Sequence, residues 1–335
     1  MSMSDNVSID SAVKLSAVPR RLRSALIVDA ACDLPDTFFK SPHVAVMPIT
    51  VRIDNTRLID QHDPRATAQF LSGQFGDATA SAETIPMSER EISAMFLERF
   101  VLDYDSVYCL TVSSSRSPIY DHAMRASAFI GREARVIRQN AEINRPFQLR
   151  VVDTKTAFAA QGVIALALDD MLKRGVPPFE IRTRLFEVID STCVYVMPDD
   201  LQYMRARARA KGDRSISFMN AMVGSALDIK PVIRGRLGET GPVAKIRGRD
   251  PAHQKLFRFV ARQVQRGLNT PHMVVSYGSS LEELRSLSGY SELVYACANE
   301  GVTLHESVMS ITGMLITGKK SISIGFAAPE HAPDF

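Results

Sequence analysis

A hydroxyl-rich turn after an apolar strand is the part of the sequence whose residue types best support chemistry. Residues 107–112 are apolar and lead into Ser113, Ser114 and Ser117, and Pro118 then suits the first turn of a helix. Hydroxyls and free backbone N–H groups at a helix N-terminus form an anion site that the helix dipole supports. Alternatively, the serines only cap the helix. This stretch alone favours neither interpretation.

A second hydroxyl group precedes another predicted helix. Thr84 lies two residues before Pro86, and Ser88 begins a capping box with Glu91. An anion held by neutral hydroxyls, without a lysine, is bound without being strongly paired. That arrangement suits a carboxylate that must later react.

The sequence contains no group of residues with the spacing of a metal site, a nucleotide site or a catalytic nucleophile. No two of its seven histidines have the spacing of metal ligands, and its four cysteines lie far apart. The sequence also lacks a Walker A motif, a Gly-x-Gly-x-x-Gly loop after a strand and a Gly-x-Ser-x-Gly elbow. We therefore expect no metal, no cofactor and no catalytic residues, and we interpret the cysteines as reduced core residues of a cytoplasmic protein.

Basic residues cluster in one short run, although the formal net charge of the chain is only +3. Arg205, Arg207, Arg209 and Arg214 belong to this run, in which we expect the cations to face solvent. A solvated segment, a protein-docking patch and a nucleic-acid site all remain open. The run contains no interleaved aromatic residue, and the chain has no Trp, which does not favour base stacking.

The elements that must position these residues fall into two groups. Up to residue 174 the chain alternates apolar strands and amphipathic helices, which predicts a mostly parallel sheet covered by helices. Beyond it, a hairpin pattern and further strands and helices predict an α+β region. We expect a disordered tail over residues 1–23, an α/β domain over 24–175 and an α+β domain over 176–335. Individual expectations include a connection over residues 132–147, a Met-rich helix over 215–227 and a strand over 293–298.

The chain reads as a soluble protein. With 335 residues, of which 45% are hydrophobic, it is long enough for two cores. Its N-terminus lacks the unbroken apolar stretch of a signal peptide, and no apolar run approaches the ~18 residues of a membrane span.

Several motifs occur in the order found in the DegV family of bacterial fatty-acid-binding proteins, and the sequence resembles that family over residues 25–326. The family's opening Asp-Ser-x-x-Asp-Leu-Pro corresponds to residues 29–35, and its Ser-Ser-x-x-Ser-Gly-Thr-Tyr corresponds to residues 113–120. Its Thr-Ser-Gln-Pro corresponds to residues 83–86. Further matches lie at residues 46–51, 60, 151–155, 200–204, 229–231 and 246–249.

The resemblance implies a two-domain DegV-like fold with a ligand tunnel between the domains. It implies that Thr84, Ser113, Ser114 and Ser117 hold the carboxylate of a long-chain fatty acid. It further implies that a partner fatty acid kinase phosphorylates that carboxylate, so that the binding protein is not itself the catalyst. Docking of that partner would fall to Arg247 of the Arg-Gly-Arg motif and to the arginines of the basic run.

The chain departs from the family pattern at several of these motifs. Pro118 and Ile119 replace Gly and Thr, and Glu83 places a carboxylate beside Thr84. The family's His-x-Gly-Pro-Gly, whose histidine serves the carboxylate end, begins here with Ile316. Two alternatives follow: a divergent regulatory or interaction module that binds another amphiphile or no lipid, and nucleic-acid binding through residues 205–214.

Overall fold

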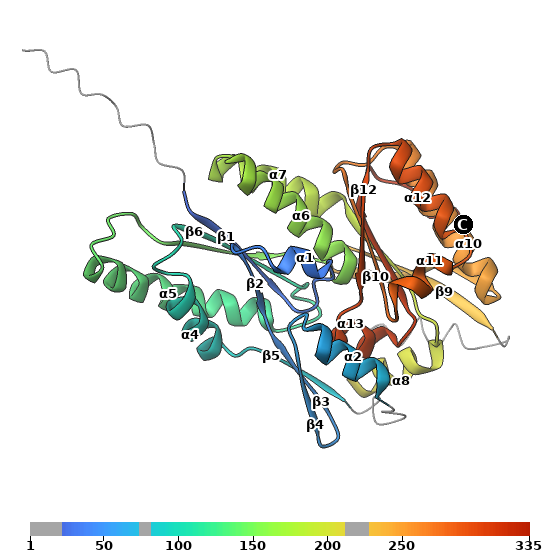
Figure 1. Ribbon diagram of the computed structural model, residues 1–335, viewed down its shortest axis with the longest axis horizontal. Coiled ribbons are helices and arrows are strands. Elements are labelled where there is room, and N and C mark those ends of the chain that lie inside the picture. The colour runs from blue at the N-terminus through green and yellow to red at the C-terminus, as the bar shows by residue number, and fades with distance from the viewer. Residues whose placement is uncertain (1–21, 74–81, 212–227) are drawn as a thin grey trace, which may run out of the picture.

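The computed structural model describes residues 22–73, 82–211 and 228–335, which form three sheets and the helices between them (Figure 1). Most of the expected N-terminal tail, the expected helix over residues 215–227 and Arg214 lie outside these ranges.

The first sheet is fully parallel. Its strands run in the order β2 (Val44–Met47), β1 (Ser24–Asp29), β6 (Ser106–Thr111) and β7 (Gln148–Asp153). Alternate residues of β1 and β6 face opposite sides, as the pleat requires. One side packs on α4 (Glu89–Arg99) and α5 (Ile119–Asn140), and the other packs on α6 (Phe158–Arg174) and α7 (Pro178–Ser191). This layered arrangement confirms the predicted α/β region.

The second sheet has six strands. Their order is β10 (Glu239–Arg247), β9 (Ile229–Arg236), β8 (Thr192–Met197), β13 (Ile322–Ala327), β11 (His272–Tyr277) and β12 (Thr303–Val308). Neighbours are antiparallel except β11 and β12. α10 (Arg249–Arg266), α11 (Leu281–Ser286) and α12 (Tyr290–Asn299) contribute to the core on one face. The mixed sheet confirms the predicted second sheet-rich region.

α6 lies between the two sheets and contacts β1 on one side and β8, β11 and β13 on the other (Figure 1). Two glycines permit this close packing. A Cβ atom at Gly325 of β13 would lie 2.4 Å from the backbone of Ala159, and one at Gly162 would lie 2.5 Å from the carbonyl oxygen of Asp33. The start of α6 is therefore in direct backbone contact with both neighbours.

A third, antiparallel sheet has the order β4 (Thr56–Asp60), β3 (Ile49–Ile53) and β5 (Glu83–Pro86). Its inner face packs with α2 (Pro64–Ser72) and α13 (Ile311–Thr317) in a separate apolar cluster. α13 also contacts α8 (Leu201–Lys211). The remaining short helix, α1 (Asp36–Phe39), follows β1.

Two predicted elements are wrong. The apolar residues 293–298 form part of α12, because Tyr290, Leu293, Ala296 and Cys297 recur at helical spacing and are all buried. The charged stretch 132–147 is largely the second half of α5, which runs to Asn140. Across the described ranges, no helix is long and apolar enough to cross a membrane.

Candidate functional site

The serine turn lies at the topological switch point of the parallel sheet. β1 and β6 are neighbours in the middle of the sheet, and their carboxyl ends are where ligands bind in open α/β sheets. Asp29, at the end of β1, accepts hydrogen bonds from the backbone N–H groups of Val112 and Ala31, the latter at 2.9 Å. This buried carboxylate therefore fixes the loops after β1 and β6 relative to each other.

Each serine of the predicted site has a partner within the protein. The Ser114 hydroxyl donates to Asp153 at 2.6 Å, and the backbone N–H of Ser114 donates to the same carboxylate at 3.2 Å. Ser113 is buried, and its hydroxyl lies 2.9 Å from that of Ser115. The Ser117 hydroxyl accepts from the N–H of Ile119 at 3.3 Å, which is a capping contact at the start of α5. The protein's own groups thus order the turn.

The second sheet covers the serine turn through the β9–β10 hairpin. The hydroxyl of Ser115 donates to the carbonyl of Gly238 at 3.0 Å, and the N–H of Gly238 donates to the backbone carbonyl of Lys155 at 2.7 Å. Arg116 donates to the hydroxyl of Thr240. Gly238 has a φ of +84°, a conformation that favours glycine. The site is therefore built from both sheets.

The loop after β7 contains two residues in the left-handed region. Lys155 and Phe158 have φ values of 53° and 56°. Such strain in residues with side chains persists where the surroundings impose it, and it is common at functional sites. Two backbone hydrogen bonds hold this loop. The N–H of Ser113 donates to the carbonyl of Thr156, and the carbonyl of Ala31 accepts from the N–H of Phe158.

Thr84 faces the apolar cluster between the third sheet and α13. In the β3–β5 register, Thr84 pairs with Val51, and paired side chains lie on the same face of a sheet. Val51 is fully buried in that cluster. Glu83 lies on the opposite face, where it forms an ion pair with Arg52 at the surface. The Glu83 carboxylate therefore points away from the face on which Thr84 lies.

Ile316 and Lys319 occupy the motif in which the family has His-x-Gly-Pro-Gly. Ile316 is half-buried and packs against the small cluster of Phe158, Val194 and Val196. The Lys319 ammonium donates to the carbonyls of Leu71 and Gly73 at 2.8 and 3.0 Å. An apolar contact and a tethered lysine thus replace the family's histidine motif.

Three buried aspartates hold together the elements around the serine turn and α13. Asp33 accepts from the Ser276 hydroxyl at 2.6 Å and from the Ser310 N–H at 2.9 Å, while Asp60 accepts from the Thr312 N–H at 2.7 Å. Burial raises the pKa of Asp29 and of Asp33 to about 6, and that of Asp60 to about 7. Hydrogen bonds to each carboxylate oppose this increase.

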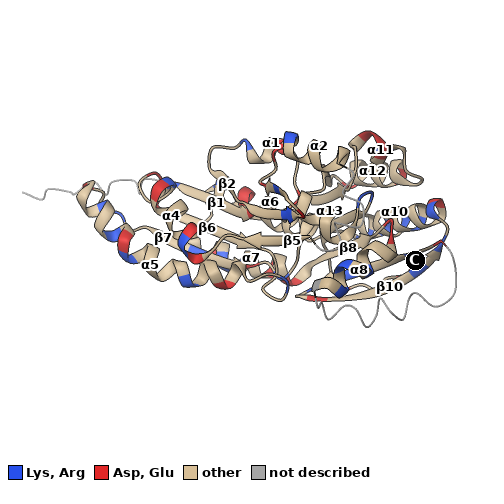
Figure 2. Ribbon diagram, turned by 90° about the horizontal axis from the view of Figure 1, so that it is seen from below, with Lys and Arg blue, Asp and Glu red and all other residues tan. Residues whose placement is uncertain are grey.

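The basic run forms α8, and the expectation that its cations all face solvent is wrong for Arg207. That side chain is 4% exposed and donates to the carbonyl of Ala82 at 2.7 Å, next to β5. Arg205 is half-buried, and Arg209 and Arg247 are exposed. The ribbon of α8 carries blue, basic segments in Figure 2. Arg207 is therefore a structural contact between α8 and the third sheet, and it is not placed to dock a partner.

Sequence reasoning did not identify Asp153 and Gly238 as parts of this site. Asp153 ends a strand in the same sheet as the serine turn, and parallel neighbours end at the same edge, so the fold pattern contained a signal for it. Gly238 belongs to a hairpin predicted only as a turn, and nothing local indicated that it contacts the serines. The described ranges contain no group of three or more His, Cys, Asp or Glu side chains suited to a metal ion.

Comparison with known proteins defines the class to which this fold and site belong. The family model for DegV, whose description is an uncharacterised protein family, matches residues 23–329. The chain belongs to the DegV family. A DegV domain-containing protein of Xanthomonas axonopodis pv. citri is 47% identical over 311 residues, which cover 93% of this chain and 99% of that protein.

Solved structures share the fold at low sequence identity. DegV from Bacillus subtilis, described as a fatty acid binding protein, has a TM-score of 0.69 at 19% identity and covers 92% of this chain and 100% of its own. The fatty acid kinase B3 protein of Streptococcus pneumoniae, solved with linoleic acid, has a TM-score of 0.70 at 12% identity, with the same coverage.

Proposed function

We propose that this protein binds a long-chain fatty acid between an N-terminal α/β domain, residues 24–175, and a C-terminal α+β domain, residues 176–335. It presents the carboxylate to a partner kinase in the cytoplasm and does not catalyse the reaction itself. The observation that carries the proposal is the serine turn at the switch point, covered by the β9–β10 hairpin, in a fold shared with proteins described as binding fatty acids. Ser113, Ser114, Ser117 and Thr84 form the carboxylate site of this proposal.

A cluster of buried apolar side chains lies on the same face of the third sheet as Thr84. Val51 and Leu58 of that sheet meet Met309, Met314 and Leu315 around α13. Methionine side chains adapt to irregular apolar ligands. Each methylene transferred from water to apolar surroundings contributes about 0.8 kcal/mol, so an acyl chain would supply most of the affinity. The hydroxyls then set the position and direction of the head group.

The direct test is to extract the purified protein with solvent and to measure bound fatty acid by mass spectrometry. We expect a stoichiometric long-chain fatty acid, or uptake of one when the delipidated protein is titrated. Protein that is reproducibly empty and takes up none would contradict the proposal.

A double variant tests the assigned residues. Replacing Ser114 and Ser117 by Ala should weaken fatty acid binding, while Ser127→Ala, whose hydroxyl bonds only within α5 to Met124, should leave it unchanged. Equal affinity in all three proteins would show that the serines only order the turn.

Two observations favour a second candidate, a divergent member that binds another amphiphile or no lipid and acts as an interaction module. Ile316 replaces the family histidine, and Pro118 and Ile119 replace the family's Gly and Thr in the serine turn. Incubation of the lipid-loaded protein with ATP and the fatty acid kinase of the same organism separates the two. Acyl phosphate supports the carrier function, and bound lipid without acyl phosphate supports the divergent module.

A further inference from the structure

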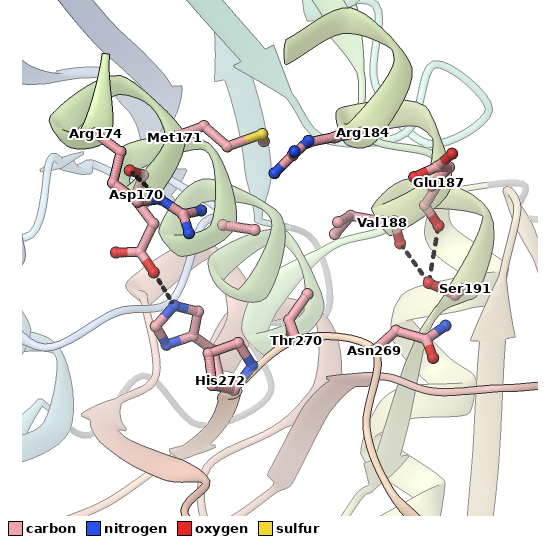
Figure 3. Close-up of a pocket in the computed structure, with 12 residues that line it drawn as sticks. Asp170, Met171, Arg174, Arg184, Glu187, Val188, Ser191, Asn269, Thr270 and His272 are labelled. Atoms are coloured by element: carbon pink, nitrogen blue, oxygen red, sulfur yellow. Dashed lines mark hydrogen bonds and ion pairs between the residues drawn. The ribbon is translucent and has the colours of Figure 1, made fainter. Parts of the chain in front are cut away.

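A cavity of about 550 Å³ lies between α6, α7 and the segment that joins α10 to β11 (Figure 3). This volume is within the range of small-molecule sites. Its walls come from the last turns of α6 and from one side of α7. Its floor is residues 269–272. Arg174 is roughly 20 Å along α6 from Gln161, which contacts Asp29 at the serine site. The cavity is therefore separate from the proposed fatty acid site.

Two guanidinium groups reach this cavity from facing helices. Arg174 projects from α6, and Arg184 extends from α7 towards Met171 (Figure 3). Arg174 donates only its Nε to the carbonyl of Asp170, at 3.2 Å, and Arg184 pairs with Glu180 through one nitrogen. Within the described part of the chain, no other partner of either guanidinium is found, so donors remain for a ligand. Arginine binds phosphate with paired, charge-assisted hydrogen bonds.

The floor contains a buried hydroxyl group that indicates a missing hydrogen-bond partner. Thr270 is 7% exposed, and its hydroxyl has no hydrogen-bond partner among the described residues. A buried hydroxyl without a partner costs about 1–3 kcal/mol, so a partner is expected there. Backbone hydrogen bonds fix the floor. The N–H of Asn269 donates to the carbonyl of Ala327 at 2.8 Å, and the carbonyl of Pro271 accepts from the N–H of Thr303 at 2.8 Å.

Acidic and amide groups complete the lining. The Asp170 carboxylate is hydrogen-bonded to Nε2 of His272 at 2.9 Å. Glu187 lies on α7 beside Val188 and Ser191 (Figure 3). With Asn269, Glu187 supplies acceptors for hydroxyl donors. A plain anion would be repelled by this carboxylate. A ligand that combines a phosphate with hydroxyls satisfies both sets of groups.

We propose that this cavity binds a small phosphorylated polyol, with its phosphate on Arg174, Arg184 and Thr270 and its hydroxyls on Glu187 and Asn269. The ligand bridges α7 and the floor segment, and thus the two halves of the molecule. It occupies a site distinct from the one that holds the acyl chain.

Isothermal titration calorimetry of the full chain with glycerol 3-phosphate, inorganic phosphate and glycerol tests this inference. We expect saturable binding of glycerol 3-phosphate, weaker binding of phosphate and none of glycerol. Arg174→Gln and Arg184→Gln should each weaken binding roughly tenfold or more, because each removes hydrogen bonds to a charged group. Arg182→Gln, on the exposed side of α7 and outside the lining, is the matched control.

Two further variants separate ligand contacts from structural effects. Thr270→Val should weaken binding without lowering the thermal midpoint, because it removes an unpartnered hydroxyl. Glu187→Gln should reduce the preference for glycerol 3-phosphate over phosphate. Absence of saturable heat up to about 10 mM of both phosphates, the weak end of measurable affinity, overturns the proposal. Equal affinities in the Arg184→Gln and Arg182→Gln proteins also overturn it.

Discussion

The Ser114 hydroxyl donates a 2.6 Å hydrogen bond to the carboxylate of Asp153, so an acid from the neighbouring strand occupies the donor that a bound carboxylate would use. The Ser114 N–H donates to the same group. A fatty acid head group at this serine must compete with a negative charge that the protein itself supplies. In the proposed site, Asp153 would thereby weaken the binding of a carboxylate while it keeps the turn ordered.

Asp153→Asn should therefore increase the affinity for a fatty acid by removing like-charge repulsion while retaining an acceptor for Ser114. The affinity for the corresponding fatty alcohol should not change, since the alcohol is neutral. Displacement of a fluorescent fatty acid measures both. The exposed Asp103→Asn serves as the control, and a parallel gain for the alcohol would show that repulsion is not the cause.

Ile316→His tests whether the family's histidine can be restored. We expect tighter fatty acid binding, stronger below the pKa of the new imidazole than above it, because the cation attracts a carboxylate. We also expect a lower thermal midpoint, since the substitution removes apolar packing against Phe158, Val194 and Val196. Ile316→Val controls for the packing loss. Identical affinities for the two variants at low pH would contradict a head-group position near residue 316.

Asp60→Asn should make stability less dependent on pH. The folded-state pKa of Asp60 is raised by burial from 3.8 to about 7, so the folded protein holds a proton that the unfolded chain releases. Stability from this group is complete below about pH 4 and is lost as the pH rises towards 7. The neutral amide removes that loss, so the free energy of unfolding of the variant should exceed that of the wild type increasingly over this window, by up to a few kcal/mol.

Chemical denaturation at several pH values measures this difference, with Asp54→Asn in the exposed β3–β4 turn as the control. A gap between Asp60→Asn and the wild type that stays constant from pH 4 to 7 would rule out titration of Asp60 in this window.

Arg138→Leu should destabilise the protein by about 3–5 kcal/mol, because it removes the shortest ion pair of the buried Asp105 carboxylate and the donor to three backbone carbonyls. Arg138 is 2% exposed and donates to Asp105 and to the carbonyls of Val101, Tyr104 and Arg145, all at 2.7 Å. Arg135→Leu, exposed on the same helix, should change the free energy of unfolding little. A similar small change in both variants, measured by urea denaturation, would contradict this assignment.

Arg138 also shows why part of the fold was not predicted. The density of charge over residues 132–147 suggested a connection, yet the guanidinium is buried because four acceptors satisfy it. Arg207 was likewise expected to face solvent, but it is buried and donates to the carbonyl of Ala82. Charge patterning indicates exposure only where no internal partner exists, and partners distant in the sequence are not visible in a local window.

The predicted parallel sheet, its covering helices and the second sheet-rich region were all confirmed, because their strands carry strong local patterns. The apolar residues 293–298 were misassigned, since a short apolar run fits a buried strand as well as a buried helix. The relationship of Glu83 to Thr84 required the register between β3 and β5, which separates their side chains onto opposite faces. Sequence neighbours in a strand do not share a surface.

The position of α6 has a consequence for cooperativity. Its first turns touch Asp33 on one side and Gly325 on the other through backbone atoms, so neither half of the chain has a complete core without it. Cleavage near residue 175 leaves α6 on the N-terminal fragment, so the C-terminal fragment should not fold by itself, and calorimetry of the intact protein should show one transition.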